Sequence, residues 1–445
     1  MKNKFIIPSF AFYDRTGIQK YLEKQAAKGW MLEKAGNYCW RFRRMEPKKI
    51  RFCVTYFPYA DIYDPAPSEE EETFREFCAH GGWTLAGSNA QMQIFWSEAE
   101  DPMPIETDPV MEVENIHKSM KKGMLTAYWL LLVNCLIQFA NQGLAVGNGL
   151  VNYLSNGMNI WLLATWILLC VLSVGRLVMY YGWRRKAKRA AELDGVFVET
   201  RSIMWAENLA AILVFGGMIG LILTLEDRRM AMMLGICMAL AFLIIILIEL
   251  FRQWMKHVGF DAADSKKYTL IVSVVLALVL CFGGIPTVGN YVLNSDMHER
   301  EMAADLTLDI RDLLGEEAAD HKTMVLTDND SPFLGYQRIY QYPGGSLMTP
   351  NLEYNLVEVK ADFLYDMSLE EMVTVPVYMT DGSFLPFDPA PWGAERVWQL
   401  HDGEDLRQWY VLCYEDYVLE IFPSWEMTAE QMATVGEIFG GEGVS

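Results

Sequence analysis

Five long apolar stretches between Leu125 and Asn294 constrain the fold more than any other feature of this sequence. They cover roughly residues 124–143, 158–181, 205–225, 230–251 and 268–293. A helix of about 20 residues, rising about 1.5 Å per residue, crosses a hydrocarbon core of about 30 Å. Segments of this length satisfy their backbone hydrogen bonds inside lipid only as helices. The sequence therefore predicts a multi-pass α-helical membrane protein with five transmembrane helices and a soluble domain at each end.

Lysine and arginine mark alternate ends of these stretches. Three connections are cationic, and they lie before the first stretch (Lys118, Lys121, Lys122), between the second and third (Arg184, Arg185, Lys186, Lys188, Arg189, Arg201), and between the fourth and fifth (Arg252, Lys256, Lys266, Lys267). The connection over residues 141–157 contains no charged residue. Because cytoplasmic loops carry the excess of positive charge, we expect a cytoplasmic N-terminus and an extracytoplasmic C-terminus.

The acidic charge of the chain is concentrated in its last third. The net charge is −20, yet residues 291–445 contain 30 acidic and 7 basic side chains, whereas residues 1–290 contain 27 and 30. Such an asymmetry indicates soluble parts in different surroundings. The acidic domain would attract a cationic extracytoplasmic ligand, although solubility is the simpler explanation of its charge.

The soluble parts divide into three segments. Residues 1–100 contain a helix–strand–strand unit twice, with the helices expected on one face of an antiparallel sheet, so they predict a small cytoplasmic α+β domain. The acidic, proline-rich stretch 101–114 predicts a linker over residues 101–123, and residues 124–293 are the five-helix domain. Residues 294–445 predict an acidic extracytoplasmic α+β domain. Its expected elements are a helix over 296–314, strands over 323–326, 336–342, 352–359 and 372–378, a hairpin over 409–422 and a final helix after Thr428.

Glycines and aromatic residues of the N-terminal domain carry a resemblance to a known family. The pattern consists of a Phe-rich opening segment, Lys28-Gly29-Trp30-Met31-Leu32, Tyr38-x-Trp40-x-Phe42, Glu46-Pro47 and Gly82-Trp83. These residues resemble the bacterial domain-of-unknown-function family 2812, in which the domain often precedes several membrane helices. The resemblance implies this architecture and a bacterial cell membrane, and it implies no activity.

Two sets of residues are candidates for contacts. A basic cluster near one hairpin would touch anionic lipid or an acidic protein, or would simply be a solvated strand face; it consists of Arg41, Arg43, Arg44, Lys48, Lys49 and Arg51. In the first stretch Asn134 and Gln138 lie four residues apart, and in the third stretch Gly216 and Gly220 form a GxxxG spacing. Both pairs are typical of helix packing in membranes.

No motif indicates catalysis, a metal site or a cofactor, so we expect no enzymatic activity and no cofactor. Nucleic acid is disfavoured as a partner because residues 1–123 contain 17 basic and 18 acidic side chains. A folded domain on each side of a bilayer favours a membrane sensor, regulator or scaffold whose cytoplasmic domain binds a protein partner. The alternative is an accessory subunit of a membrane transporter.

Overall fold

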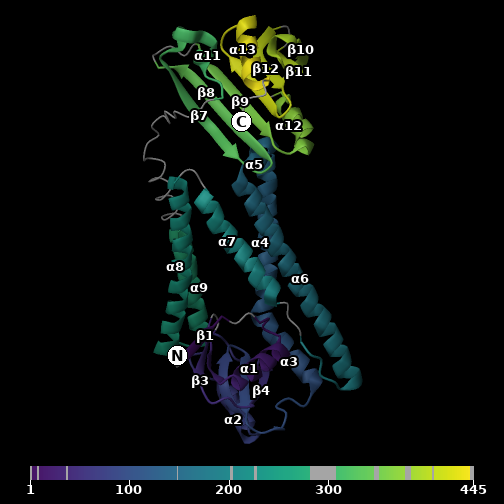
Figure 1. Cartoon of the computed structure of the whole chain (residues 1–445). Helices are drawn as coiled ribbons and strands as arrows, with labels where there is room; N and C mark the ends of the chain where they lie inside the picture. Colours follow the sequence, from purple (N-terminus) through teal and green to yellow (C-terminus); the bar gives the residue numbers. More distant parts are fainter. Residues whose placement is uncertain are drawn as a thin grey trace. The chain divides into compact units, whose positions relative to one another are not determined.

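The computed structural model describes residues 3–7, 10–36, 39–147, 149–200, 204–224, 228–280, 307–344, 350–375, 382–402 and 405–440. The chain forms two compact units. One contains Met1–Leu136 and Ile167–Val292, and the other contains Ile137–Trp166 and Leu293–Ser445. The long helices α4 (Met124–Val146) and α6 (Gly157–Asp194) each continue from one unit into the other (Figure 1).

The N-terminal domain is built from one strand–helix–strand–strand unit that occurs twice. The first copy comprises β1 (Asn3–Ile6), α1 (Arg15–Ala27), β2 (Trp30–Ala35) and β3 (Trp40–Arg44). The second comprises β4 (Arg51–Tyr56), α2 (Glu69–His80), β5 (Thr84–Asn89) and β6 (Met92–Ser97). Each copy forms its own three-stranded antiparallel sheet, in the orders β1-β3-β2 and β4-β6-β5. The repeat is therefore present, but the single sheet expected from the sequence is wrong.

Equivalent residues shape the two copies. Asp14 caps α1 by accepting a hydrogen bond from the Gly17 amide, and Ser68 caps α2 by accepting one from Glu71. Gly29 and Gly82 follow the two helices with φ of +80° and +83°, a left-handed conformation that glycine adopts without a Cβ clash. The register of each hairpin shifts at the same place, between Leu32 and Lys34 and between Leu85 and Gly87.

The core of this domain extends into the segment expected to be a linker. Helix α3 (Pro109–Lys122) begins at the N-cap Asp108, with Pro109 in its first turn. Its residues Ile116 and Met120 are buried in the same hydrophobic cluster as Ile18 and Phe42. Residues 109–122 are thus part of the domain core, because an amphipathic helix buries its apolar face wherever one is offered.

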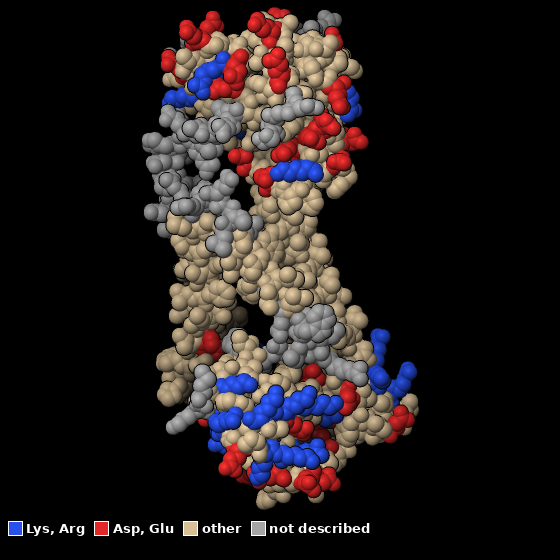
Figure 2. Space-filling model, viewed as in Figure 1, with Lys and Arg blue, Asp and Glu red and all other residues tan. Residues whose placement is uncertain are grey.

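Three described helices are long and apolar enough to cross a membrane, namely α4, α6 and residues Ala231–Val258 of α8 (Arg228–Val258). Helix α7 (Met204–Thr224) matches the third expected stretch, and α9 (Ala262–Val279) covers part of the fifth, the rest of which lies outside the described residues. Many large apolar side chains of these helices are exposed, and their surface in Figure 2 is almost free of charge. Such a surface is typical of contact with lipid.

The C-terminal domain contains a seven-stranded antiparallel sheet in the order β10-β11-β12-β13-β9-β8-β7. The strands are β7 (His321–Asp330), β8 (Leu334–Pro343), β9 (Leu352–Val359), β10 (Gly382–Phe387), β11 (Arg396–Asp402), β12 (Asp405–Cys413) and β13 (Tyr417–Pro423). The expected hairpin over 409–422 is present as β12 and β13. The strand expected over 372–378 is wrong at its start, because Met372 ends α12 (Tyr365–Met372), and residues 376–378 lie outside the described range.

Helices cover both faces of this sheet. On one face α11 (Ile310–Leu314) and α13 (Ala429–Gly440) pack over a core that includes Tyr354 and Ile421. Of the helix expected over 296–314, residues 310–314 are helical and residues 296–306 are not described. On the other face α12 packs together with α5 (Leu150–Ser155), the short helix between α4 and α6 (Figure 1). The C-terminal unit therefore includes the uncharged loop that separates the first two long helices.

Candidate functional site

The basic cluster expected from the sequence lies on strands β3 and β4 and on the turn between them. Arg41 forms an ion pair with Glu33 at 2.8 Å, and Lys48 forms one with Glu98 at 2.5 Å. The guanidinium of Arg44 lies 5.0 Å from the ring centre of Trp30 and donates to the carbonyl of Lys28. The remaining three residues, Arg43, Lys49 and Arg51, are exposed. Neighbouring groups thus engage half of the cluster.

A band of lysine and arginine nevertheless crosses the face of the N-terminal domain seen in Figure 2. Its contact with lipid or with a partner stays a prediction.

The two candidate helix-packing pairs have few partners. Asn134 and Gln138 are half-buried on α4, and neither side-chain amide makes a hydrogen bond to any residue that the structure describes. A Cβ added at Gly216 or Gly220 of α7 would meet nothing within 4 Å. Helix packing through these four residues therefore stays a prediction.

The structure instead brings conspicuous residues together where the N-terminal domain meets α3, the end of α6 and the segment 195–200. We call this region the junction. Asp14, only 4% exposed, accepts a hydrogen bond from the Thr200 hydroxyl at 2.9 Å as well as capping α1. Thr16 and Thr200 exchange two further hydrogen bonds, each from a backbone amide to the other hydroxyl, at 3.0 and 3.2 Å. These bonds fix the segment after α6 against the start of α1.

A buried ion pair lies beside these hydrogen bonds. The Arg15 Nη1 and Glu112 Oε2 atoms are 2.9 Å apart in a contact that is charge pairing rather than an aligned hydrogen bond. Glu106, which accepts a hydrogen bond from the Thr55 hydroxyl, interacts electrostatically with Glu112. Burial raises the pKa of both carboxyls, and Arg15 opposes the rise. Two carboxyls and one arginine therefore share a site that favours retention of one proton.

Aromatic rings form the third part of the junction. The ring of Tyr13 lies 5.2 Å from that of Tyr180 and 5.4 Å from that of Trp183, both on α6. The Tyr180 hydroxyl lies 2.9 Å from Nδ1 of His117 on α3. These contacts join Tyr13 to α6, and α6 to α3. An edge-to-face aromatic pair such as Tyr13–Tyr180 adds about 0.5–1.5 kcal/mol beyond the area it buries.

A cavity of about 480 Å³ opens at the junction. Its lining combines aromatic, aliphatic and charged side chains from the Tyr13 segment, one face of α6 and the segment after it: Tyr13, Met179, Gly182, Trp183, Lys186, Val198 and Glu199. The volume is within the usual range for small-molecule sites, about 300–1,000 Å³.

The C-terminal unit contains two carboxylates with defined roles. Glu371 of α12 accepts hydrogen bonds from the backbone amides of Leu150 and Val151, at 2.8 and 3.0 Å, and so caps the start of α5. Glu420 of β13 is 7% exposed and accepts from Asn355 at 2.6 Å and from Trp409 at 2.8 Å. Burial raises the pKa of Glu420 to about 7 although both hydrogen bonds lower it. Glu371 thus links α12, which packs on the sheet, to α5 in the loop between α4 and α6.

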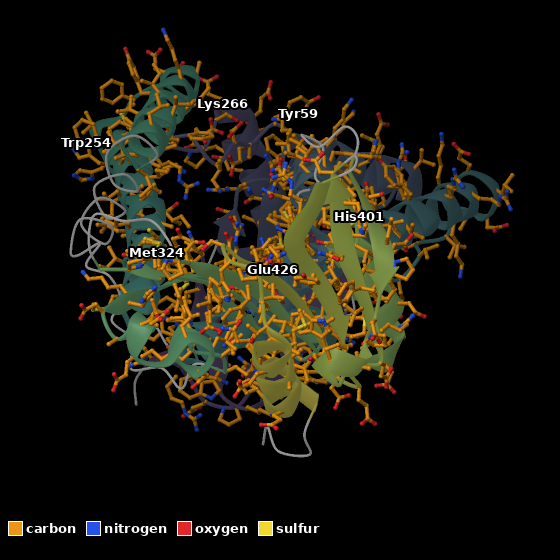
Figure 3. The ribbon with its side chains drawn as sticks, turned by 90° about the horizontal axis from the view of Figure 1, so that it is seen from above. Tyr59, Trp254, Lys266, Met324, His401 and Glu426 are labelled. Carbon is orange, nitrogen blue, oxygen red and sulfur yellow. The ribbon has the colours of Figure 1, made fainter. Side chains whose placement is uncertain are left out.

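Aromatic residues also gather where α8 turns into α9. Trp254, labelled in Figure 3, lies 5.8 Å from Phe251 and 6.2 Å from Phe260, and Phe260 lies 6.4 Å from Tyr268 (distances between ring centres). Lys266, labelled in the same view, is on the first turns of α9. Aromatic rings beside lysines at a helix end are typical of the membrane–water interface.

Comparison with known proteins identifies the N-terminal part. Residues 14–129 match the family model described as Protein of unknown function (DUF2812). The match includes all the glycines and aromatic residues of the resemblance from Lys28 to Trp83. It continues through α3 into α4. The DUF2812 region thus includes Asp14, Arg15 and Glu112 of the junction. No curated protein and no solved structure matches the chain.

The junction is not recognisable in the sequence alone. Thr200 and Trp183 are more than 150 positions from Asp14 and Tyr13, and nothing in the one-dimensional pattern pairs them. A local pattern was available only for Asp14, a common N-cap residue placed directly before an amphipathic helix.

Proposed function

We propose that the chain is a non-enzymatic integral membrane protein that couples an extracytoplasmic domain to a cytoplasmic DUF2812 domain, as a sensor, regulator or scaffold. The observation that carries this proposal is that each folded domain is built onto an end of the long apolar helices. The core of the N-terminal domain continues through α3 to Leu177 and Tyr180 of α6. In the other unit, Glu371 holds α5 and Val151 is part of the core of the sheet. Energetic coupling between distant sites is carried by packed side chains, hydrogen bonds and rigid elements of this kind.

The proposed topology has five spans, with the N-terminus in the cytoplasm and the C-terminus outside the cell membrane of a bacterium. Contacts inside each unit support it. The N-terminal domain packs near the cationic end of α6, and Lys256 near the end of α8 interacts electrostatically with Asp61 and Asp64 of that domain. The C-terminal sheet packs on α5, in the loop that has no charge. Both arrangements agree with the positive-inside rule.

The proposed partners follow from the same arrangement. The cytoplasmic domain would bind a protein partner, with the basic band as one candidate surface. The acidic outer domain would bind a cationic ligand, because its field attracts positive charge. The bilayer itself is the third partner.

Hydrogen exchange of the full chain in lipid nanodiscs tests the coupling. Glu371→Ala removes the acceptor for the Leu150 and Val151 amides, and Glu370→Ala, an exposed neighbour on the same helix, is the matched control. We expect Glu371→Ala to speed exchange at residues 150–155 and also at the junction residues 196–200, whereas Glu370→Ala changes neither. A change confined to α5 would reject coupling and leave a passive anchor.

The alternative is an accessory transporter subunit, and one observation favours it. The amides of Asn134 and Gln138 lie in an apolar helix without a hydrogen-bond partner in the described part of the chain. Polar groups in such a position can line a path for a polar substrate. If they do, replacing both residues with leucine abolishes uptake or efflux while leaving the Glu371→Ala response unchanged.

A further inference from the structure

The cavity at the junction is held open by fixed walls. One wall is α6, where Met179, Gly182, Trp183 and Lys186 share a face because they are spaced three and four residues apart. The opposite wall is the segment after α6, which the Thr200 hydrogen bonds to Asp14 and Thr16 hold in place. A ligand therefore would not need to order this segment, which lowers the entropic cost of binding.

The cavity lies where α6 leaves the apolar span. The stretch expected to cross the bilayer ends near residue 181, and the next residues of the helix are Trp183 and a run of cations. Tyrosine and tryptophan are enriched at this depth, where the headgroups and glycerol esters of lipids lie. Leu193, Val196 and Phe197, which follow the run of cations, are exposed apolar side chains. The surroundings of the cavity are thus suited to a molecule with both apolar and polar parts.

The charge of the site selects for an anion. Residues 184–189 include five cations, Arg184, Arg185, Lys186, Lys188 and Arg189. Lys186 lines the cavity and has no ion pair with any residue in the described ranges, whereas Lys188 is paired with Glu192 at 3.5 Å. The one acidic residue in the lining, Glu199, is paired with Lys20 at 3.0 Å. Trp183 also lines the cavity, although its indole N–H is buried and is not bonded to any described residue.

We propose that this cavity binds an anionic phospholipid of the adjacent leaflet, with its phosphate at Lys186 and its glycerol and upper acyl chain on the apolar lining formed by Tyr13, Met179, Trp183 and Val198. A soluble anion would use the cation but would leave the aromatic and aliphatic lining without a role. A zwitterionic lipid would fill the apolar part but would set its own cation against the five on α6. Binding at this place stabilises the junction, because the lipid bridges α6 and the start of the DUF2812 region.

The site depends on α6 crossing the bilayer and not on any protein partner, so it can fail independently of the proposed function. The test is native mass spectrometry of the full chain, purified in detergent and exposed to equal amounts of phosphatidylglycerol and phosphatidylcholine. Lys186→Gln removes the cation of the cavity. Lys188→Gln removes the same charge from the same helix at a position outside the cavity.

We expect the wild-type chain to retain phosphatidylglycerol in preference to phosphatidylcholine. Lys186→Gln should reduce that preference about fivefold, the effect of one cation near a lipid phosphate, and Lys188→Gln should keep it. Trp183→Ala should lower retention of both lipids. Equal retention of the two lipids by the wild-type chain, or an unchanged preference in Lys186→Gln, would overturn the proposal. So would displacement of the lipid by millimolar inorganic phosphate, which would identify the site as one for a soluble anion.

Discussion

At the scale of single residues, the stability of the junction depends on the ion pair between Arg15 and the buried Glu112. Arg15 is the cation beside Glu112, which is 3% exposed, and beside the half-buried Glu106. Breaking a buried pair costs more than forming it gains, because the remaining charge keeps its desolvation penalty. Arginine is suited to this position because its guanidinium remains charged at any physiological pH.

Replacement of Arg15 by methionine therefore should destabilise the junction by about 3–5 kcal/mol above about pH 8, where Glu112 is ionised and loses its cation, and by less at lower pH, where Glu112 holds a proton. We expect faster hydrogen exchange in α3 and in residues 196–200. The control Lys20→Met breaks an ion pair whose side chains are about 60% exposed, and it should change exchange very little. Adding Glu112→Gln to Arg15→Met should recover part of the loss. A double variant no more stable than Arg15→Met would show that desolvation of Glu112 is not the cause.

Glu420 makes the stability of the C-terminal domain depend on pH. Burial raises its pKa from the ordinary 4.5 to about 7, so the folded domain binds a proton that the unfolded chain has released. The contribution of Glu420 to the free energy of unfolding is therefore fully present below about pH 4.5 and is lost as the pH rises to about 7. The total loss is on the order of 3 kcal/mol.

Glu420→Gln should abolish this decline. The difference in stability between the variant and the wild type should therefore shift in favour of the variant from pH 5 to pH 8. Thermal unfolding of the full chain at the two pH values measures the difference. Glu415→Gln, in the exposed turn before β13, is the control and should follow wild type. A wild-type chain whose C-terminal transition does not shift between pH 5 and pH 8 would contradict the prediction.

At the scale of elements, the equivalent glycines of the two copies, Gly29 and Gly82, have different surroundings. A Cβ on Gly29 would lie 2.7 Å from the backbone oxygen of Met45, whereas a Cβ on Gly82 would meet nothing within 4 Å. Both residues have positive φ, so alanine costs about 1 kcal/mol at either position from conformation alone. Only at Gly29 must the backbone at Met45, directly after β3, also move.

Gly29→Ala should therefore destabilise its hairpin by at least about 2 kcal/mol, and Gly82→Ala by about 1 kcal/mol. Native-state hydrogen exchange of the β2–β3 and β5–β6 amides gives both values in the full chain. Equal losses in the two copies would show that the contact with Met45 relaxes at little cost.

Local sequence patterns predicted elements better than their partners. The strand expected over 352–359 is β9, and the helix expected after Thr428 is α13, whose start Thr428 and Gln431 cap with reciprocal hydrogen bonds. The pairing of strands was not predictable in the same way, because β4 resembles a third strand of the first sheet until its bonds to β6 are known. Prolines and acidic residues before Asp108 suggested a linker, and they concealed that Asp108-Pro109 is a helix start.

At the scale of the whole molecule, composition predicted the long apolar helices and the two α+β regions, because hydrophobic length and charge asymmetry are properties of the chain itself. The candidate site was not predictable. It depends on residues such as Tyr13, Trp183 and Thr200, which become neighbours only when α6 and the segment after it pack on the N-terminal domain. Such packing is specified by the tertiary structure and not by any local pattern.

The number of spans decides which loops face the cytoplasm. With five spans or with three, formed by α4, α6 and α8 alone, the two termini lie on opposite sides, so the termini do not distinguish the two cases. The loop between α8 and α9 does. If α7 crosses the membrane, this loop lies on the same side as the N-terminal domain, and if α7 and α9 do not cross, it lies on the opposite side.

Labelling of spheroplasts with a membrane-impermeant maleimide tests this point. In a Cys39→Ser background, Ser383→Cys in β10 and Ala263→Cys at the start of α9 are both exposed positions. We expect Ser383→Cys to react in intact spheroplasts and Ala263→Cys to react only after permeabilisation. Native Cys39, exposed in the N-terminal domain, should behave like Ala263→Cys. Reaction of Ala263→Cys in intact spheroplasts would reduce the spans to three, because α8 would then cross outward and α9 would not cross at all.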